Sequence, residues 1–217
     1  MLKIFIGYDP AETVAYHVLC HSILRQSSIP VSFTPINKAN IREFTRGVED
    51  GSTEFSFSRF LTPWLAGYEG KALFMDCDML VMCDIAEILE GNNPNQSVSV
   101  VKHDYTPKDG VKFLGNKQHA YPKKNWSSVM LFNADKCQQL TPAMANHCTG
   151  KFLHQFEWCY DVGELDKNFN HLVGELPENP KAKIAHFTLG TPCFEGYEDQ
   201  EYSKNWFEER ELMNANK

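Results

Sequence analysis

The chain has 217 residues, of which 42% are hydrophobic and 23% charged, and its formal net charge is −7 at pH 7. These values are those of one globular domain, and they exclude a disordered chain because enough apolar surface is present to form a core. The negative charge argues against a nucleic-acid groove or an anionic membrane surface as the main partner. The apolar runs are also too short to cross a bilayer.

The amino-terminal residues predict a first strand rather than an export signal. Residues 2–6 form a short run of β-branched, aromatic and other strand-forming residues that stops at Gly7, whereas a signal peptide needs a longer apolar stretch and a small-residue cleavage site. We therefore expect a cytoplasmic protein. Its seven cysteines are odd in number and contain no Cys-x-x-Cys pair, which favours reduced thiols over disulfides or a cysteine zinc site.

Strand and helix signals alternate along the chain. A helix is expected after Asp9, where Pro10 suits the first turn and Glu12 completes a capping box. The sequence predicts strands at 31–36, 71–75, 97–102, 127–133 and 183–188, and helices after 55–61, after Asp84 and over 203–213. This alternation predicts an α/β fold in which residues 1–217 form a single domain with a mostly parallel central sheet flanked by helices.

The leading candidate for chemistry is the acidic turn Asp76-Cys77-Asp78. It follows the apolar strand at 71–75 directly, and ligands of such sheets bind outside the carboxyl ends of the strands. Side chains two residues apart in an extended chain point the same way, so both carboxylates face one side. Two convergent carboxylates are costly unless a cation neutralises them, and oxygen ligands suit Mg²⁺ or Mn²⁺. The alternative is a pair of solvated turn carboxylates.

Further side chains are candidates for the same site. His186 lies near the end of a late strand and is either a metal ligand that favours Mn²⁺ or a packed core histidine. Arg59 stands among apolar residues, and a partly buried arginine needs an acidic partner or an anionic ligand. In the loop that closes the first strand, Tyr8 can stack on a base and Asp9 can cap a helix. The sequence contains no phosphate-loop, dinucleotide or nucleophile-elbow motif.

Together these features resemble the glycosyltransferases of the GT-A fold, and most of all family 8 with its short bacterial and phage relatives. The resemblance rests on a strand-terminal Asp-x-Asp, an upstream aromatic-x-Arg segment and a late histidine before a Gly-Thr-Pro turn. The matching stretches are residues 4–9, 55–60, 72–80, 102–107, 124–133 and 186–194. They spread over nearly the whole chain, which makes the resemblance far more specific than the acidic pair alone.

The resemblance implies a role for each matching residue. Asp76 and Asp78 would bind the metal, Mn²⁺ or Mg²⁺, with His186 as the third protein ligand. An acidic residue beside the transferred sugar would be Asp161 or its competitor Asp166. The residues implied in binding the donor nucleotide are Gly7, Tyr8, Asp9, Arg59, Asp76, Cys77, Asp78, Gly190 and Thr191.

The implied function is transfer of a sugar from a nucleotide-diphosphate sugar, expected to be a UDP-sugar, to a carbohydrate or other hydroxyl acceptor. The family likeness implies retention at the anomeric carbon. One alternative is a sugar-phosphate nucleotidyltransferase, but that class has a Gly-rich, basic first loop, which residues 7–12 do not form. The other alternative is a protein of the same fold that binds nucleotide or glycan without turnover.

Overall fold

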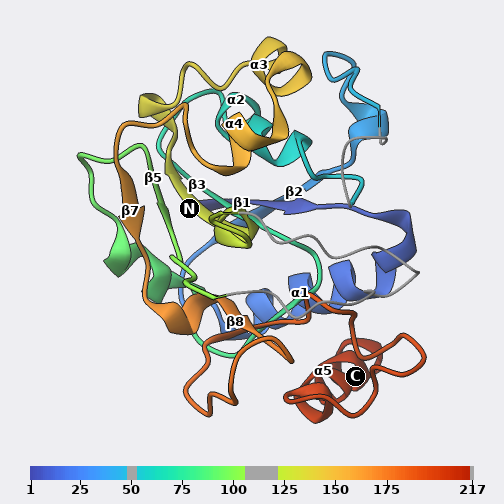
Figure 1. Ribbon diagram of the computed structural model, residues 1–217. Coiled ribbons are helices and arrows are strands. Elements are labelled where there is room, and N and C mark those ends of the chain that lie inside the picture. The colour runs from blue at the N-terminus through green and yellow to red at the C-terminus, as the bar shows by residue number, and fades with distance from the viewer. Residues whose placement is uncertain (48–52, 106–121, 216–217) are drawn as a thin grey trace.

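The computed structural model describes residues 1–47, 53–105 and 122–215 (Figure 1). Its strands are β1 (Leu2–Gly7), β2 (Val31–Ile36), β3 (Lys71–Met75), β4 (Met79–Val81), β5 (Val98–Val100), β6 (Val129–Asn133), β7 (Val162–Glu164), β8 (His171–Leu172) and β9 (Ile184–His186). Its α-helices are α1 (Thr13–Gln26), α2 (Thr62–Leu65), α3 (Pro142–His147), α4 (Gly150–His154) and α5 (Ser203–Asn214). Short 3₁₀ helices include η1 (Pro10–Glu12), η4 (Ser58–Leu61), η5 (Ile85–Gly91), η7 (Trp126–Ser128) and η9 (Lys167–Asn170). Residues 106 and 107 of the matching stretch 102–107 lie outside the described residues.

The central sheet has six strands in the order β2-β1-β3-β6-β5-β7. Strand β1 pairs in parallel with β2 and β3, and β5 pairs in parallel with β7. Strand β6 runs antiparallel to both of its neighbours, β3 and β5. All strands of this sheet except β6 therefore point the same way, which confirms the predicted α/β fold with a mostly parallel sheet.

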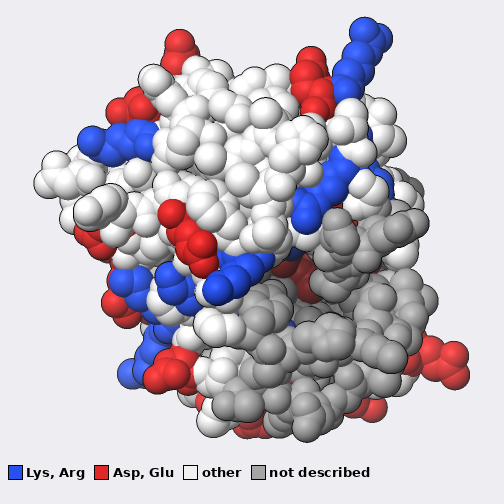
Figure 2. Space-filling view, turned by 45° about the horizontal axis from the view of Figure 1, so that its top comes forward, with Lys and Arg blue, Asp and Glu red and all other residues white. Residues whose placement is uncertain are grey.

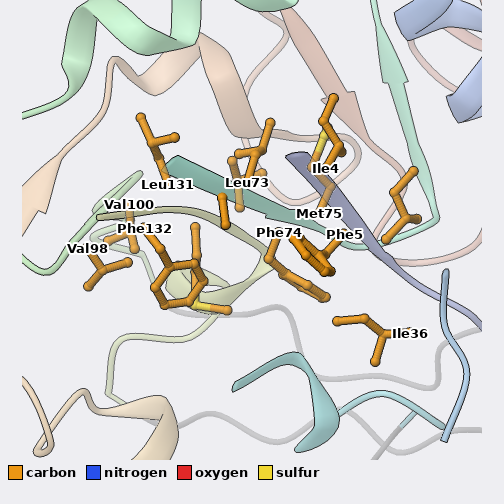
Figure 3. Packing of buried hydrophobic residues seen from close by; sticks show 14 of the residues in the cluster. Ile4, Phe5, Ile36, Leu73, Phe74, Met75, Val98, Val100, Leu131 and Phe132 are labelled. Carbon is orange, nitrogen blue, oxygen red and sulfur yellow. The ribbon is translucent and has the colours of Figure 1, made fainter. Parts of the chain in front are cut away.

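The sheet lies between helices on both faces, with α1 on one side and α2, α3 and α4 on the other (Figure 1). Strands covered on both faces are expected to be apolar throughout, and β3 and β6 satisfy this except at their outer ends, Lys71 and Asn133. Leu73, Phe74, Leu131 and Phe132 are fully buried in a continuous core together with Ile4 of β1 (Figure 3).

A second, three-stranded sheet has the order β4-β9-β8, with β4 antiparallel and β8 parallel to β9. Of its strands the sequence predicts only β9, within residues 183–188. The sequence does not predict β4, β8 or the sheet itself, because strands of two or three residues are too short to show a period. Only three residues, Asp76 to Asp78, separate the end of β3 from the start of β4. The acidic turn therefore joins the two sheets.

The carboxyl-terminal helix α5 is confirmed and packs against α1 (Figure 1). Trp206 is fully buried at this contact, and Glu209 forms ion pairs with His21 and Arg25 of α1. Within the described part of the chain, the helices are all too short or too polar to traverse a bilayer. The seven cysteines, all within that part, are unpaired. On the face shown in Figure 2, lysine and arginine side chains are interspersed with acidic ones around an uncharged area.

Gly7 ends β1 in close contact with the ring of Phe55. A Cβ atom at Gly7 would lie 2.4 Å from ring atoms of Phe55, which is itself only 1% exposed and cannot move outward freely. We expect Gly7→Ala to lower the free energy of unfolding by about 1–3 kcal/mol through overpacking. Thermal or urea unfolding measures this change. Gly47→Ala is the control, because a Cβ atom there meets nothing within 4 Å, and equal stabilities of the two variants would contradict the expectation.

Candidate metal and donor site

The turn Asp76-Cys77-Asp78 is held at each end by a different sheet. The backbone N–H of Asp76 donates to the carbonyl of Ser128 over 3.0 Å, which extends the pairing of β3 with β6. The carbonyl of Asp78 accepts from the N–H of Phe187 over 2.9 Å, which extends the pairing of β4 with β9. The two carboxylates are therefore positioned by backbone pairing at the carboxyl end of β3. A site built on sheet backbone is more precise than one on a free loop.

Asp76, Asp78 and His186 converge at this turn. One ligand atom from each lies within 4.8 Å of the others, and His186 Nε2 is 3.2 Å from Asp78 Oδ1. His186 reaches this place because β9 pairs with β4 in a register that sets it opposite Met79, next to Asp78. The three side chains are buried. Two carboxylates and one imidazole form a donor set that fits Mn²⁺, and also Mg²⁺.

Arg59 of η4 lies against the same cluster. Its Nη1 is 2.9 Å from Asp76 Oδ1 and donates to the carbonyl of Ser127 over 2.9 Å. The guanidinium also lies over the rings of Phe55 and Phe74, at 5.2 and 5.1 Å from their centroids. The sequence allows Arg59 either an acidic partner or an anionic ligand, and in the structure Arg59 has the acidic partner Asp76. Arg59 offsets part of the negative charge of the paired carboxylates.

Glu12 is a buried neighbour of the candidate site that the sequence does not reveal. The expected capping box does not form: Asp9 Oδ1 accepts from Ala11, the N–H of Glu12 donates to the backbone carbonyl of Asp9, and Glu12 Oε1 has no hydrogen-bond partner among the described residues. Instead Glu12 is buried against Cys77, whose Sγ lies 3.7 Å from Glu12 Oε2. Burial, and then the charge of Asp78, raises the pKa of Glu12 well above its usual value. The Asp9-x-x-Glu12 spacing fits a helix cap equally well, so no sequence signal separates the two arrangements.

The raised pKa of Glu12 predicts a pH-dependent effect of Glu12→Gln. Because the folded protein binds this proton more tightly than the unfolded chain, the contribution of Glu12 to stability is greatest below 4.5, its ordinary pKa. That contribution is lost as pH rises towards the folded-state pKa. We expect the glutamine variant to match the wild type at about pH 4 and to be more stable by at least about 1 kcal/mol at about pH 8. Thermal unfolding without metal measures both, and a pH-independent difference would contradict the account.

The first loop has local structural contacts. The Tyr8 hydroxyl lies 3.1 Å from Thr13 Oγ1, and the Tyr8 ring is partly exposed. Asp9 Oδ1 accepts from the backbone N–H of Ala11 over 2.9 Å, so Asp9 is the helix cap that the sequence predicts. Gly7 packs beneath Phe55. These contacts leave the role of the loop beside a nucleobase as a prediction.

Gly190 and Thr191 follow β9 on the side where His186 ends the strand. The N–H of Gly190 donates to the carbonyl of Phe187 over 2.9 Å, which turns the chain directly after the strand. Thr191 is fully buried, and its Oγ1 lies 3.2 Å from Cys193 Sγ. The side chain of Thr191 is thus engaged within its own turn, so any contact with a diphosphate at this turn would come from the backbone.

Asp161 and Asp166, the two candidates for the acidic residue beside the sugar, lie at opposite ends of the strands of the central sheet. Strand β7 points the same way as β3, so Asp161, which precedes β7, lies at the edge opposite the acidic turn. Its Oδ2 accepts from Gln96 over 2.7 Å. This placement corrects the expectation that Asp161 borders the site. Asp166 follows β7 at the carboxyl edge, where its Oδ1 caps η9 through the N–H of Asn168.

The fold is similar to those of solved glycosyltransferases. The apo structure of the bifunctional glycosyltransferase WbbM gives a TM-score of 0.64 at 13% identity over 96% of this chain and 49% of that one. This chain therefore spans about half the length of WbbM. The galactosyltransferase LgtC in complex with donor and acceptor sugar analogs gives a TM-score of 0.60 at 10% identity, over 99% of this chain and 97% of that one. The protein thus has the fold of the GT-A glycosyltransferases, as its sequence predicts.

Comparison with known sequences shows the family to which the chain belongs. No family model matches the chain. Protein CDI of Arabidopsis thaliana is 43% identical over 227 residues, which cover 98% of this chain and 87% of that protein. The chain belongs to the family of Protein CDI.

Proposed function

We propose that the protein is a metal-dependent glycosyltransferase that moves a sugar from a UDP-sugar to a carbohydrate or other hydroxyl acceptor, with retention at the anomeric carbon. The observation that carries this proposal is the Asp76, Asp78 and His186 cluster at the carboxyl edge of a GT-A sheet. Open α/β sheets bind their ligands at that edge. The complex of LgtC with donor and acceptor sugar analogs supports a sugar acceptor for this chain as well.

In this function each residue of the site would have a distinct role. Asp76, Asp78 and His186 would hold the divalent cation, and Arg59 would keep Asp76 in place through their ion pair. A bound Mn²⁺ or Mg²⁺ supplies a Lewis acid that stabilises negative charge on the leaving diphosphate. The loop from Gly7 to Asp9 would border the nucleobase. Asp166, at the same edge, remains the candidate acid beside the donor sugar.

A donor panel tests the proposal. Purified protein is incubated with UDP-, GDP- and CMP-sugars, with and without Mn²⁺, and release of the free nucleotide is measured. We expect Mn²⁺-dependent release of UDP from at least one UDP-sugar. Tight UDP binding without release from any donor would instead favour the non-catalytic alternative. Formation of pyrophosphate from UTP and a sugar 1-phosphate would favour the nucleotidyltransferase.

The role of His186 is tested separately, because a strand histidine can be either a ligand or a packed side chain. If His186 is a ligand, His186→Ala should raise the Mn²⁺ concentration for half-maximal donor hydrolysis by at least about tenfold, since a lost metal contact weakens binding. The melting temperature of the metal-free protein should change little. A packed histidine would give the reverse pattern, with a loss of roughly 1–3 kcal/mol in stability and an unchanged Mn²⁺ response. That reverse pattern would remove His186 from the metal site.

A further inference from the structure

Asn170 makes a buried hydrogen-bond network directly behind His186. Asn170 is fully buried at the end of η9, and its Oδ1 lies 2.9 Å from His186 Nδ1. Its Nδ2 lies 2.8 Å from Ser128 Oγ and 3.2 Å from the backbone carbonyl of Asn125. Ser128 Oγ in turn donates to that same carbonyl over 2.6 Å. The network therefore runs from one backbone carbonyl to the candidate metal ligand.

The orientation of the Asn170 amide is fixed by the chemistry of its partners. A backbone carbonyl can only accept, so the group that faces the Asn125 carbonyl must be the NH₂ group of Asn170. The hydroxyl proton of Ser128 is used towards the same carbonyl, which leaves Ser128 Oγ as an acceptor for the second amide proton. The carbonyl oxygen of Asn170 must then face His186, where it can only accept.

This order of donors and acceptors determines the tautomer of His186. Since the Asn170 oxygen accepts, Nδ1 must be the protonated ring nitrogen of a neutral His186. The lone pair then lies on Nε2, the atom that faces Asp78 Oδ1 over 3.2 Å. Two acceptors that face each other at this distance repel unless a cation is shared between them. Neutral imidazole with a free Nε2 is the form that binds metals.

The carbonyl at the beginning of this network belongs to the segment that leads into β6, where Asn125 precedes η7. Asn125 adopts a left-handed conformation with φ 61°, which asparagine tolerates better than most residues. Its carbonyl receives both the Ser128 hydroxyl and the Asn170 amide. The same short segment provides the carbonyl of Ser128 that holds Asp76. One segment of backbone thus positions both the carboxylate side and the imidazole side of the site.

We propose that Asn170 is a positioning residue that holds His186 in the Nδ1–H tautomer, so that Nε2 is presented to the cation bound by Asp76 and Asp78. The inference deepens the proposed function and rests on its metal site. Partners that orient a metal-ligating histidine typically change metal affinity by about 10–100-fold when they are lost. Asn170 itself touches neither metal nor donor in this role.

The first experiment compares Mn²⁺ affinity among variants, by calorimetry on the folded protein. Asn170→Leu, which removes the acceptor for Nδ1–H, should weaken Mn²⁺ binding by about 10–100-fold. Asn170→Asp keeps an acceptor for Nδ1–H but loses the amide protons, so it should bind Mn²⁺ more tightly than the leucine variant. The matched control is Asn133→Leu at the far end of β6, where a buried asparagine donates to the carbonyls of Asn93 and Gln96. This control should lose stability and keep its Mn²⁺ affinity.

The second experiment reads the tautomer in the metal-free wild type, by ¹⁵N–¹H correlation spectra of the histidine rings at a pH where His186 is neutral. We expect His186 to carry its proton on Nδ1. A proton on Nε2, or unchanged Mn²⁺ affinity in Asn170→Leu, would overturn the inference. If the wild type binds no Mn²⁺, the proposed metal site fails, and the tautomer alone then decides the role of Asn170. This reading needs no variant, so it holds even where a substitution prevents folding.

Discussion

Asp78→Ala is expected to abolish Mn²⁺-dependent donor turnover, with a loss of at least about 100-fold, while the protein remains folded. Asp78 contributes one of only two carboxylates to the cluster, and its oxygen faces His186 Nε2 over 3.2 Å. A metal ion that stabilises a leaving group contributes several kcal/mol, and each 1.36 kcal/mol corresponds to about tenfold in rate. The backbone of Asp78 would still accept from Phe187, so the link between the sheets survives the substitution.

The measurement is nucleotide release as a function of Mn²⁺ concentration, with circular dichroism to confirm folding. Asp161→Ala is the matched control, since this aspartate lies at the opposite end of the strands from the acidic turn. Its carboxylate accepts a hydrogen bond from the side chain of Gln96. It should retain the wild-type Mn²⁺ response. If Asp78→Ala keeps that response, or if Asp161→Ala loses it, the assignment of the site to the carboxyl edge of β3 is wrong.

Arg59→Met is expected to cause the largest loss of stability among these substitutions, about 3–5 kcal/mol in the absence of metal. Arg59 and Asp76 are both buried, and their side-chain atoms lie 2.9 Å apart. Removal of the guanidinium breaks the Arg59–Asp76 ion pair and leaves this carboxylate close to that of Asp78. Removal of one member of a buried ion pair is strongly destabilising.

Mn²⁺ should restore much of this lost stability, because the cation takes over the neutralising role of Arg59. A ligand that binds only the folded state stabilises it in proportion to the logarithm of its concentration over its Kd. We therefore expect a larger Mn²⁺-induced rise in melting temperature for Arg59→Met than for the wild type. Arg25→Met is the control, since Arg25 pairs with the buried Glu209 between α1 and α5. It should lose stability without any extra Mn²⁺ effect, and the same Mn²⁺ shift in all three proteins would contradict the account.

Much of the fold can be predicted from sequence patterns that are long enough to identify a strand or a helix. Strand β3 is apolar and buried from Ala72 to Met75 because helices cover both of its faces, and it leads directly into the acidic turn. The helix start at Asp9 and the long helix α5 also follow from caps and composition. The small sheet is different. Its strands have two or three residues each, and their pairing depends on tertiary contacts that no local pattern encodes.

The candidate site likewise has features that the sequence predicts and features that it does not. The pairing of Asp76 with Asp78, and the approach of His186, follow from strand ends and from family likeness. The buried position of Glu12 and the amide network of Asn170 do not, because each depends on packing between segments far apart in sequence. The sequence also does not predict the position of Asp161. That position depends on the direction of β7, which is set by the antiparallel strand β6, and sequence periodicity does not reveal strand direction.

The most direct test of the central claim is calorimetry of UDP binding to the wild-type protein with and without Mn²⁺. In the proposed function, a cation held by Asp76, Asp78 and His186 would lie between the protein carboxylates and the diphosphate. The account predicts that Mn²⁺ strengthens UDP binding by at least about tenfold, which corresponds to about 1.4 kcal/mol. Equal affinity for UDP in the presence and absence of Mn²⁺ would contradict it.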